Sequence, residues 1–268
     1  MTLDVEQVEP GVTRLRLRSL QGRLVGYEVS AYVVRGVLVD TGFAHARREL
    51  LGAVRALAPR GVIVTHWHED HAGNAPALAS EGLPMHMHAD CESTLRARPA
   101  IRAYRRLVWG ATPALDVPLA PFDPAPLETL HLPGHSPEHL VVWDAERRVL
   151  ASGDLFLGVK VRVAHETESP RALLLSLRRA AALEPRLLLD AHRGPVDDAA
   201  SKLFAKAAWL EDTMGEIARL AERGHSERAI TRAVLGREDA TAFASAGEYS
   251  KRSFVRAVLR DAGAGNEG

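Results

Sequence analysis

The first forty residues contain short runs in which apolar positions recur with the period of a β-strand. Residues 12–18 (VTRLRLR) alternate between apolar and polar side chains, and residues 29–34 and 37–40 are β-branched runs separated by Arg35-Gly36. Alternation with a period of two is typical of a strand that buries one face, and a Gly-containing pair between two such runs predicts a turn. We therefore expect the chain to begin with short strands.

The remaining pattern alternates between helical and extended segments. Leu50, Leu51, Val54 and Leu57 share one face of a predicted helix over 44–57, which Pro59 ends. Ser169 and Pro170 are the N-cap and first residue of another predicted helix. Strands are predicted at 61–64, 85–89, 127–132, 140–144, 149–152 and 187–189, and helices over 196–223, after Ser226 and over 250–259. This order predicts a mixed α/β fold with helices covering sheets.

Charge and composition narrow the class of partner. Lys plus Arg and Asp plus Glu number 34 each, so the chain has no net positive charge with which to attract nucleic acid or an anionic membrane surface. We expect a small-molecule substrate, no nucleic-acid partner and no membrane partner. The first residues lack the basic and apolar regions of a secretory signal, and no apolar run is long enough to span a bilayer. We therefore expect a cytoplasmic protein.

Three of the 12 histidines fall within six residues, directly after the predicted strand at 61–64. His66 and His68 have the i, i+2 spacing that projects two side chains to the same side of an extended segment. Asp70 and His71 lie on the turn beyond and point to a neighbouring volume. Imidazole nitrogens and carboxylate oxygens suit zinc, iron and manganese. The single cysteine, Cys91, excludes a thiolate zinc cluster, so the sequence predicts a metal site built from His and Asp.

Further metal-ligand candidates occupy turns that follow apolar runs. His135 lies in Pro133-Gly134-His135-Ser136-Pro137, Asp154 follows Ser152-Gly153, and His192 follows Asp190-Ala191. Loops at one edge of a sheet commonly carry a functional site. Each of these residues alone could be an ordinary turn residue, but as a set they reinforce the histidine-rich segment.

The segment His66-Trp67-His68-Glu69-Asp70-His71 resembles the H-x-H-x-D-H signature of the metallo-β-lactamase-fold hydrolases. His135, Asp154 and His192 follow in the order and at roughly the intervals of that superfamily, so the resemblance covers about residues 10 to 195. It implies a four-layer αββα sandwich with the site along one edge. We expect residues 1–195 to form this core and residues 196–268 to form a C-terminal helical extension packed on the core near the site.

The resemblance also implies a ligand set for two divalent metal ions. By motif, His66, His68 and His135 would hold the first ion, Asp70, His71 and His192 the second, and Asp154 would bridge both. Asp70 would also orient the hydroxide derived from metal-bound water. Asp40 and His139 resemble positions that support the ligands, although a turn-capping role and plain packing explain them equally well. Zinc is the expected metal, with iron and manganese as alternatives.

The resemblance favours ester-type substrates of small molecules. Two ions can share one hydroxide and stabilise the developing anion, which suits hydrolysis. The ligand set and the C-terminal helices resemble thioester hydrolases of the glyoxalase II type, so we expect a thioester or lactone. Lactone hydrolases of this fold carry a characteristic tyrosine near the site, and we take Tyr32, Tyr104 and Tyr249 as the only candidates for it, none in a matching motif.

Other functions remain open at this point. Persulfide dioxygenases of this fold use a single iron held by two histidines and one aspartate, which His66, His135 and Asp154 match. A phosphodiesterase is a further alternative, although the neutral chain offers little means of holding a polyanion. A non-catalytic binding protein on the same fold predicts lost ligands, and none is lost. The C-terminal helices could form the substrate pocket or the surface of a homodimer.

Overall fold

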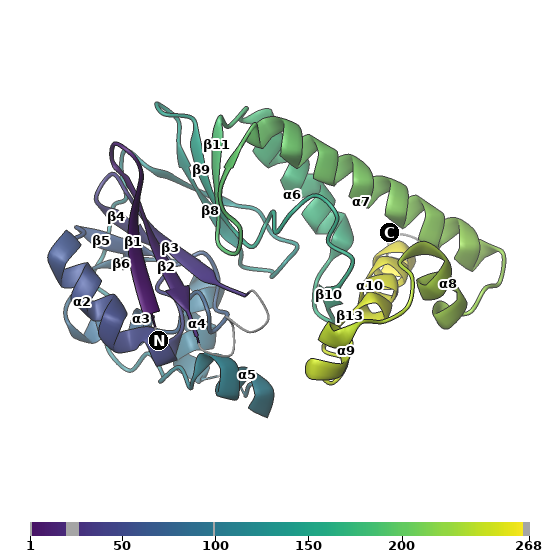
Figure 1. Ribbon diagram of the computed structural model, residues 1–268, viewed down its shortest axis with the longest axis horizontal. Helices are drawn as coiled ribbons and strands as arrows, with labels where there is room; N and C mark the ends of the chain where they lie inside the picture. Colours follow the sequence, from purple (N-terminus) through teal and green to yellow (C-terminus); the bar gives the residue numbers. More distant parts are fainter. Residues whose placement is uncertain (1, 20–26, 99, 265–268) are drawn as a thin grey trace. The chain divides into compact units, whose positions relative to one another are not determined.

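The computed structural model describes residues 2–19, 27–98 and 100–264 (Figure 1). Contacts along the chain divide it into two compact units. The first unit comprises Met1–His131, Glu138–Asp154 and Pro185–Asp197, and the second comprises Leu132–Pro137, Leu155–Glu184 and Asp198–Gly268. The chain therefore crosses between the units several times.

The first unit contains two sheets. In the six-stranded sheet the strands follow chain order, with antiparallel pairing from the first to the fourth strand and parallel pairing beyond. These strands are β1 (Thr2–Glu9), β2 (Val12–Arg18), β3 (Val29–Val34), β4 (Val37–Val39), β5 (Gly61–Ile63) and β6 (Met85–His86). The five-stranded sheet has the order β12-β11-β9-β8-β7. Its strands are β7 (Glu128–His131), β8 (Leu140–Asp144), β9 (Val149–Gly153), β11 (Leu187–Asp190) and β12 (Gly194–Asp197).

Strand β3 contributes side chains to both hydrophobic cores of this unit. Its side chains alternate between the two faces of the sheet, as the pleat requires. Ala31 and Val33 pack into one core with the helices, whereas Tyr32 and Val34 pack into a second core with residues of β8, β9 and β11 from the other sheet. Both faces are covered, which explains why every residue of β3 is buried although the strand lies among antiparallel neighbours.

The helices of the first unit follow the strands of the six-stranded sheet. A 3₁₀ turn, η1 (Ala44–Ala46), leads into α2 (Arg47–Leu57), which buries Leu50 and Val54 and ends at Ala58 in the left-handed conformation. The predicted helix over 44–57 is thereby confirmed, with its first turn tightened. The later helices are α3 (Ala75–Ser80), α4 (Ala89–Ala97) and α5 (Ala103–Trp109).

The second unit is mainly helical. Ser169 caps α6 (Pro170–Ala182) by accepting a hydrogen bond from Ala172 N, as predicted. The long helix α7 (Ala199–Glu222) is followed by α8 (Glu227–Val234), whose N-cap is Ser226 as predicted. The unit is completed by α9 (Ala240–Ala244), α10 (Lys251–Ala264) and the short strand pair β10 (Ala164–His165) and β13 (Tyr249–Ser250).

Several elements differ from the prediction. Strand β1 was not predicted, and residues 194–197 form strand β12 rather than the start of a helix, so α7 begins only at Ala199. Strand β12 contains Pro195, which cannot donate a ladder hydrogen bond, and it accordingly lies at the edge of its sheet. Within the described part of the chain, no helix is both long and apolar enough to cross a membrane.

Candidate metal centre

The loop after β5 buries six polar side chains in a short stretch, and four of them are metal-ligand candidates. His66 and His71 are fully buried, and His68 and Asp70 are 4% and 6% exposed. The backbone leaves the extended conformation after His68, whose carbonyl oxygen accepts hydrogen bonds from the amides of His71 and Ala72. Because buried polar groups need partners, such a concentration calls for either internal pairing or a ligand.

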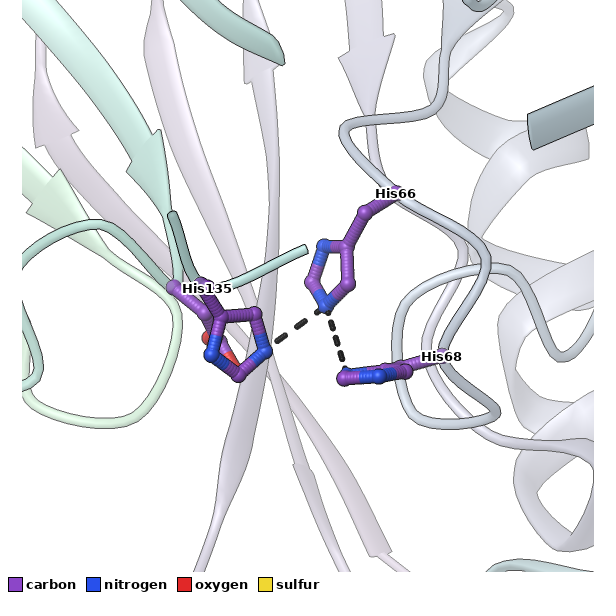
Figure 2. A group of neighbouring side chains, drawn as sticks. His66, His68 and His135 are labelled. Carbon is purple, nitrogen blue, oxygen red and sulfur yellow. Dashed lines mark hydrogen bonds and ion pairs between the residues drawn. The ribbon is translucent and has the colours of Figure 1, made fainter. Parts of the chain in front are cut away.

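The structure brings the seven predicted ligand residues into two neighbouring groups. In each group, one candidate ligand atom from every residue lies within 4.8 Å of the others. One group contains His66, His68, His135 and Asp154, and the other contains Asp70, His71 and His192. Figure 2 shows the imidazole rings of His66, His68 and His135 turned toward one another. The residues come from the loop after β5, the loop 132–137, the end of β9 and the turn after β11.

Asp154 faces both groups with different oxygens. Its Oδ1 lies 3.2 Å from Nε2 of His71 and 3.1 Å from Nε2 of His192. Its Oδ2 lies 4.0 Å from Nε2 of His66. Asp70 closes the second group, with Oδ2 at 3.7 Å from Nε2 of His192. The carboxylate of Asp154 is therefore placed where it can serve two cations at once.

The electrostatics of the centre are those of a site for cations. Burial by itself would lower the pKa of His192, but Asp154 and Asp70 raise it to about 9. Burial would likewise lower the pKa of His71, yet Asp154, Asp40 and Asp70 raise it well above its ordinary value. For Asp154, burial would raise the pKa, and the two histidines hold it well below its usual range. The carboxylates thus attract positive charge, which protons supply when no metal is bound.

Asp40, which was predicted to support the ligands, lies between two parts of the histidine loop. Its Oδ2 is 2.8 Å from Nδ1 of His71, and its carboxylate accepts hydrogen bonds from N and Oγ1 of Thr65 at 2.8 and 2.9 Å. Asp40 has a φ of +61°, a left-handed conformation that is uncommon for a residue with a side chain. A strained residue at a functional site commonly serves a positioning role.

His139 and Gly153 hold the backbone beside Asp154. The amide of Asp154 donates a hydrogen bond to Nε2 of His139 at 3.1 Å. Gly153 has a φ of +47°, and a Cβ there would lie 2.8 Å from Nε2 of His139 and 2.9 Å from Oγ1 of Thr65. Only glycine fits such a close approach without displacing its neighbours.

His192 is oriented by the backbone on both sides. Its Nδ1 lies 2.9 Å from the carbonyl oxygen of Glu28, so Nε2 is the nitrogen directed at Asp154. Oδ1 of Asp190 accepts hydrogen bonds from the amides of His192 and Arg193, both at 2.8 Å, which fixes the turn after β11. A histidine held through one nitrogen presents the other in a defined tautomer and direction.

Tyr27 is a residue of this centre that the sequence analysis missed. Its hydroxyl lies 3.3 Å from Oδ2 of Asp70 and 3.3 Å from Nε2 of His192. Limiting the candidate tyrosines to positions 32, 104 and 249 was therefore wrong. Tyr32 instead donates to the carbonyl oxygen of Asp190 from within the core. The only local signal for Tyr27 is its position two residues before a fully buried strand, at the end where site loops gather.

The chain is similar to known proteins in both fold and sequence. The profile of the metallo-beta-lactamase superfamily matches residues 24–192, more than half of the chain. A metallo-beta-lactamase family protein from Thermus thermophilus superposes with a TM-score of 0.68 at 20% identity, covering 96% of this chain and 95% of that one. A beta-lactamase domain protein from Burkholderia ambifaria superposes with a TM-score of 0.71 at 21% identity, covering 97% and 88%. The predicted fold class, including the C-terminal helices, is confirmed.

The curated relatives include proteins named as thioesterases. An atrochrysone carboxyl ACP thioesterase of Aspergillus novofumigatus is 25% identical over 214 residues, covering 76% of this chain and 61% of that protein. Another, of Passalora fulva, is 28% identical over 167 residues, covering 58% and 46%. The chain therefore spans between about half and three fifths of the length of these relatives. It belongs to the metallo-beta-lactamase superfamily, as the histidine motif predicted.

Proposed function

We propose that this member of the superfamily is a hydrolase that uses two divalent metal ions to cleave a thioester of a small molecule. The observation that carries the proposal is the position of Asp154, whose two oxygens face two separate groups of nitrogen and oxygen donors. A single ion does not need seven donors, and one carboxylate shared by two groups is the arrangement expected of a two-metal site.

The residues fit such a pair of ions. Among the described residues, the buried Nε2 of His71 has no hydrogen-bond partner, although it lies next to the oxygen of Asp154. A coordinated cation would satisfy that nitrogen and displace the protons that the carboxylates otherwise attract. The donors are imidazole and carboxylate, and Cys91 is buried elsewhere, in the core. This set suits zinc first and also iron or manganese.

The proposed ligand assignment follows the two groups. His66, His68 and His135 would hold one ion, Asp70, His71 and His192 the other, and Asp154 would contact both. Divalent ions bound in this way lower the pKa of water and stabilise the negative charge that develops on a carbonyl oxygen. Asp70 accepts a hydrogen bond from Tyr27 through Oδ2, which places the tyrosine hydroxyl beside the second donor group. Tyr27 can donate its hydroxyl proton in a hydrogen bond to a substrate oxygen.

A thioester is favoured over other hydrolysable bonds for two reasons. Two of the relatives similar in sequence are named as thioesterases that act on a carrier-bound acyl group. A thiolate also leaves without prior protonation, which suits a centre whose histidines and aspartates would be occupied as metal ligands. The balanced charge of the chain, 34 acidic and 34 basic residues, gives no general means of holding a polyanionic phosphodiester.

Lactone hydrolysis is a second candidate, and Tyr27 is the observation that favours it. Lactone hydrolases of this fold carry a characteristic tyrosine near the site. In this chain the Tyr27 hydroxyl lies 3.3 Å from Oδ2 of Asp70 and 3.3 Å from Nε2 of His192. A tyrosine hydroxyl there could hydrogen-bond the ring oxygen or carbonyl oxygen of a lactone. The lactone and thioester proposals use the same metal ligands and differ only in leaving group.

Metal analysis and a substrate panel test the proposal. We expect close to two metal ions per chain after reconstitution, and a kcat/KM at least tenfold higher for thioesters than for an aryl phosphodiester. The matched control is His225→Gln, which changes an exposed histidine far along the chain from the motif and should keep both metal ions. One iron per chain under all conditions would favour the dioxygenase alternative, and preferred turnover of the phosphodiester would overturn the carbonyl proposal.

A further inference from the structure

A cavity of about 310 Å³ lies beside the histidine loop, within the first unit. Trp67 and Glu69, the two residues that alternate with the metal-ligand candidates of the motif, form part of its lining, and the rest comes from α4, α5 and the chain on either side of α5. The ring of Trp67 is 4.9 Å from the ring of His68. Trp67 is therefore a wall that the cavity shares with the candidate metal centre.

Two of the residues that line this cavity each have a buried side-chain oxygen with no hydrogen-bond partner among the described residues. These oxygens are Oε1 of Glu69 and Oγ1 of Thr112. Glu69 is 2% exposed, and its other oxygen, Oε2, pairs with the buried guanidinium of Arg105. Buried polar groups are almost always paired, so an acceptor and a hydroxyl without partners in two residues of one cavity lining point to a ligand that supplies the missing partners.

The other lining residues define the chemistry of that partner. Leu95 and Ile101 add apolar side chains to a lining that also contains the ring of Trp67, and such a lining suits a chain of methylene or methyl groups. Arg98 and Arg106 line the same cavity and are exposed to solvent, so they add positive charge to its solvent-exposed lining. Arginine at such a position favours phosphate or carboxylate. The volume lies within the range of small-molecule sites.

We propose that the cavity binds the thiol-bearing half of the substrate, as an extended amide chain with an anionic end. A secondary amide carries both an N–H donor for Glu69 and a carbonyl acceptor for the hydroxyl of Thr112. The apolar part of the chain packs on Trp67, and the anionic end binds Arg98 and Arg106. This inference rests on the proposed thioester hydrolysis, because it assigns the leaving group of that reaction.

Calorimetric titration with S-methyl phosphopantetheine tests the cavity without turnover. This thioether has amides and a phosphate but no free thiol to bind a metal ion and no bond to hydrolyse. We expect it to bind the metal-loaded protein at least tenfold more tightly than S-methyl pantetheine, which lacks the phosphate. Replacing both arginines (Arg98→Ala with Arg106→Ala) should remove that difference, while the control Arg55→Ala, at an exposed arginine of α2, should keep it.

A second pair of variants tests the hydroxyl of Thr112. Thr112→Val should weaken the binding of both ligands by about fivefold, and Thr112→Ser, which keeps the hydroxyl, should restore it. Equal binding of the two ligands to the unaltered protein, or no effect of the arginine variants, would overturn the cavity proposal. Hydrolysis of phenyl thioacetate, which lacks the amide chain, separates the two proposals. If the unaltered protein does not hydrolyse phenyl thioacetate, the proposed function is wrong. If it hydrolyses phenyl thioacetate but does not bind S-methyl phosphopantetheine, only the cavity assignment is wrong.

Discussion

The carboxylate of Asp40 holds the ring of His71 from behind, with Oδ2 at 2.8 Å from Nδ1. The opposite nitrogen, Nε2, then lies 3.2 Å from Oδ1 of Asp154. A carboxylate that binds one nitrogen of a histidine directs the other nitrogen and raises its basicity as a metal ligand. Asp40 also accepts hydrogen bonds from Thr65, so one side chain links the end of β5 to the ligand loop.

Asp40→Asn should therefore weaken metal binding without removing a ligand. An asparagine has one acceptor oxygen, and it cannot accept hydrogen bonds from Thr65 and His71 as the carboxylate does. We expect affinity for one of the two ions to fall by about tenfold to a hundredfold, measured by competition with a chelator. The matched control is Asp144→Asn, which alters a buried carboxylate paired with Arg35. Unchanged metal affinity in Asp40→Asn would refute the positioning role.

Asp154→Ala should be more damaging than His192→Ala. Asp154 faces both donor groups, whereas His192 belongs to one. We expect the aspartate variant to retain little of either ion and the histidine variant to retain one ion with weak residual turnover. Metal content by mass spectrometry of the native protein checks this. Equal and complete loss of metal in both variants would contradict the assignment of His192 to only one of the two metal sites.

Tyr27→Phe should lower turnover but leave metal content unchanged. The substitution removes only the hydroxyl, which contacts Asp70 and His192 without belonging to either donor group. We expect kcat/KM to fall by about tenfold, a loss of about 1.4 kcal/mol in transition-state stabilisation. Comparing thioester and lactone substrates shows which reaction uses the hydroxyl more. A parallel loss of metal would instead make Tyr27 part of the metal-binding structure.

Glu28 gives a pH-dependent contribution to stability. Burial would raise the pKa of its carboxyl, but hydrogen bonds from Arg16 and Arg14 outweigh that effect and lower the pKa below the ordinary 4.5. A group whose pKa is lower in the folded state stabilises the protein above the unfolded pKa and loses that effect as the pH falls through the folded pKa. The stabilisation is therefore complete at neutral pH and is lost progressively as the pH falls from about 4.5 through the lower pKa of the folded state.

Glu28→Gln should expose this dependence. At pH 7 we expect it to reduce the free energy of unfolding by about 1 kcal/mol, and the difference from the unaltered protein should shrink as the pH falls below about 4.5. Denaturant unfolding at several pH values measures this. The control is Glu211→Gln, which removes an exposed partner of Arg178 and should cost little at any pH. A difference that stays constant down to about pH 3 would contradict the lowered pKa.

The strands and helices with strong local patterns were predictable from the sequence. Leu15 and Leu17 alternate along β2, and Ser169 with Pro170 marks the start of α6, so each element carries its own signal. Strand β1 was missed because its residues are only half-buried at the sheet edge, which leaves little apolar contrast. Strand β12 was missed because Pro195 argues against a strand anywhere except at an edge. The predicted division of the chain after residue 195 stays a prediction.

The same distinction between local and distant signals applies to the candidate centre. One short segment contains four of the ligand candidates, His66, His68, Asp70 and His71. Its metal-binding character can therefore be inferred from the sequence alone. Tyr27 meets Asp70 across 43 positions and His192 across 165, and no local pattern records such a meeting. The unpaired oxygens of Glu69 and Thr112 are likewise a property of packing, because only the folded chain shows which polar atoms lack partners.

Gly153 constrains the order in which this protein can change by mutation. Any side chain at this position would meet Nε2 of His139 and Oγ1 of Thr65, and the left-handed φ of +47° penalises it further. A substitution there could be accepted only after residues 65 and 139 had both become smaller. Thr65 binds Asp40, however, and His139 binds the amide of Asp154, so either earlier step would itself disturb the centre. Every single-step route away from glycine therefore passes through an impaired protein, and we expect descendants that keep the activity to keep this glycine.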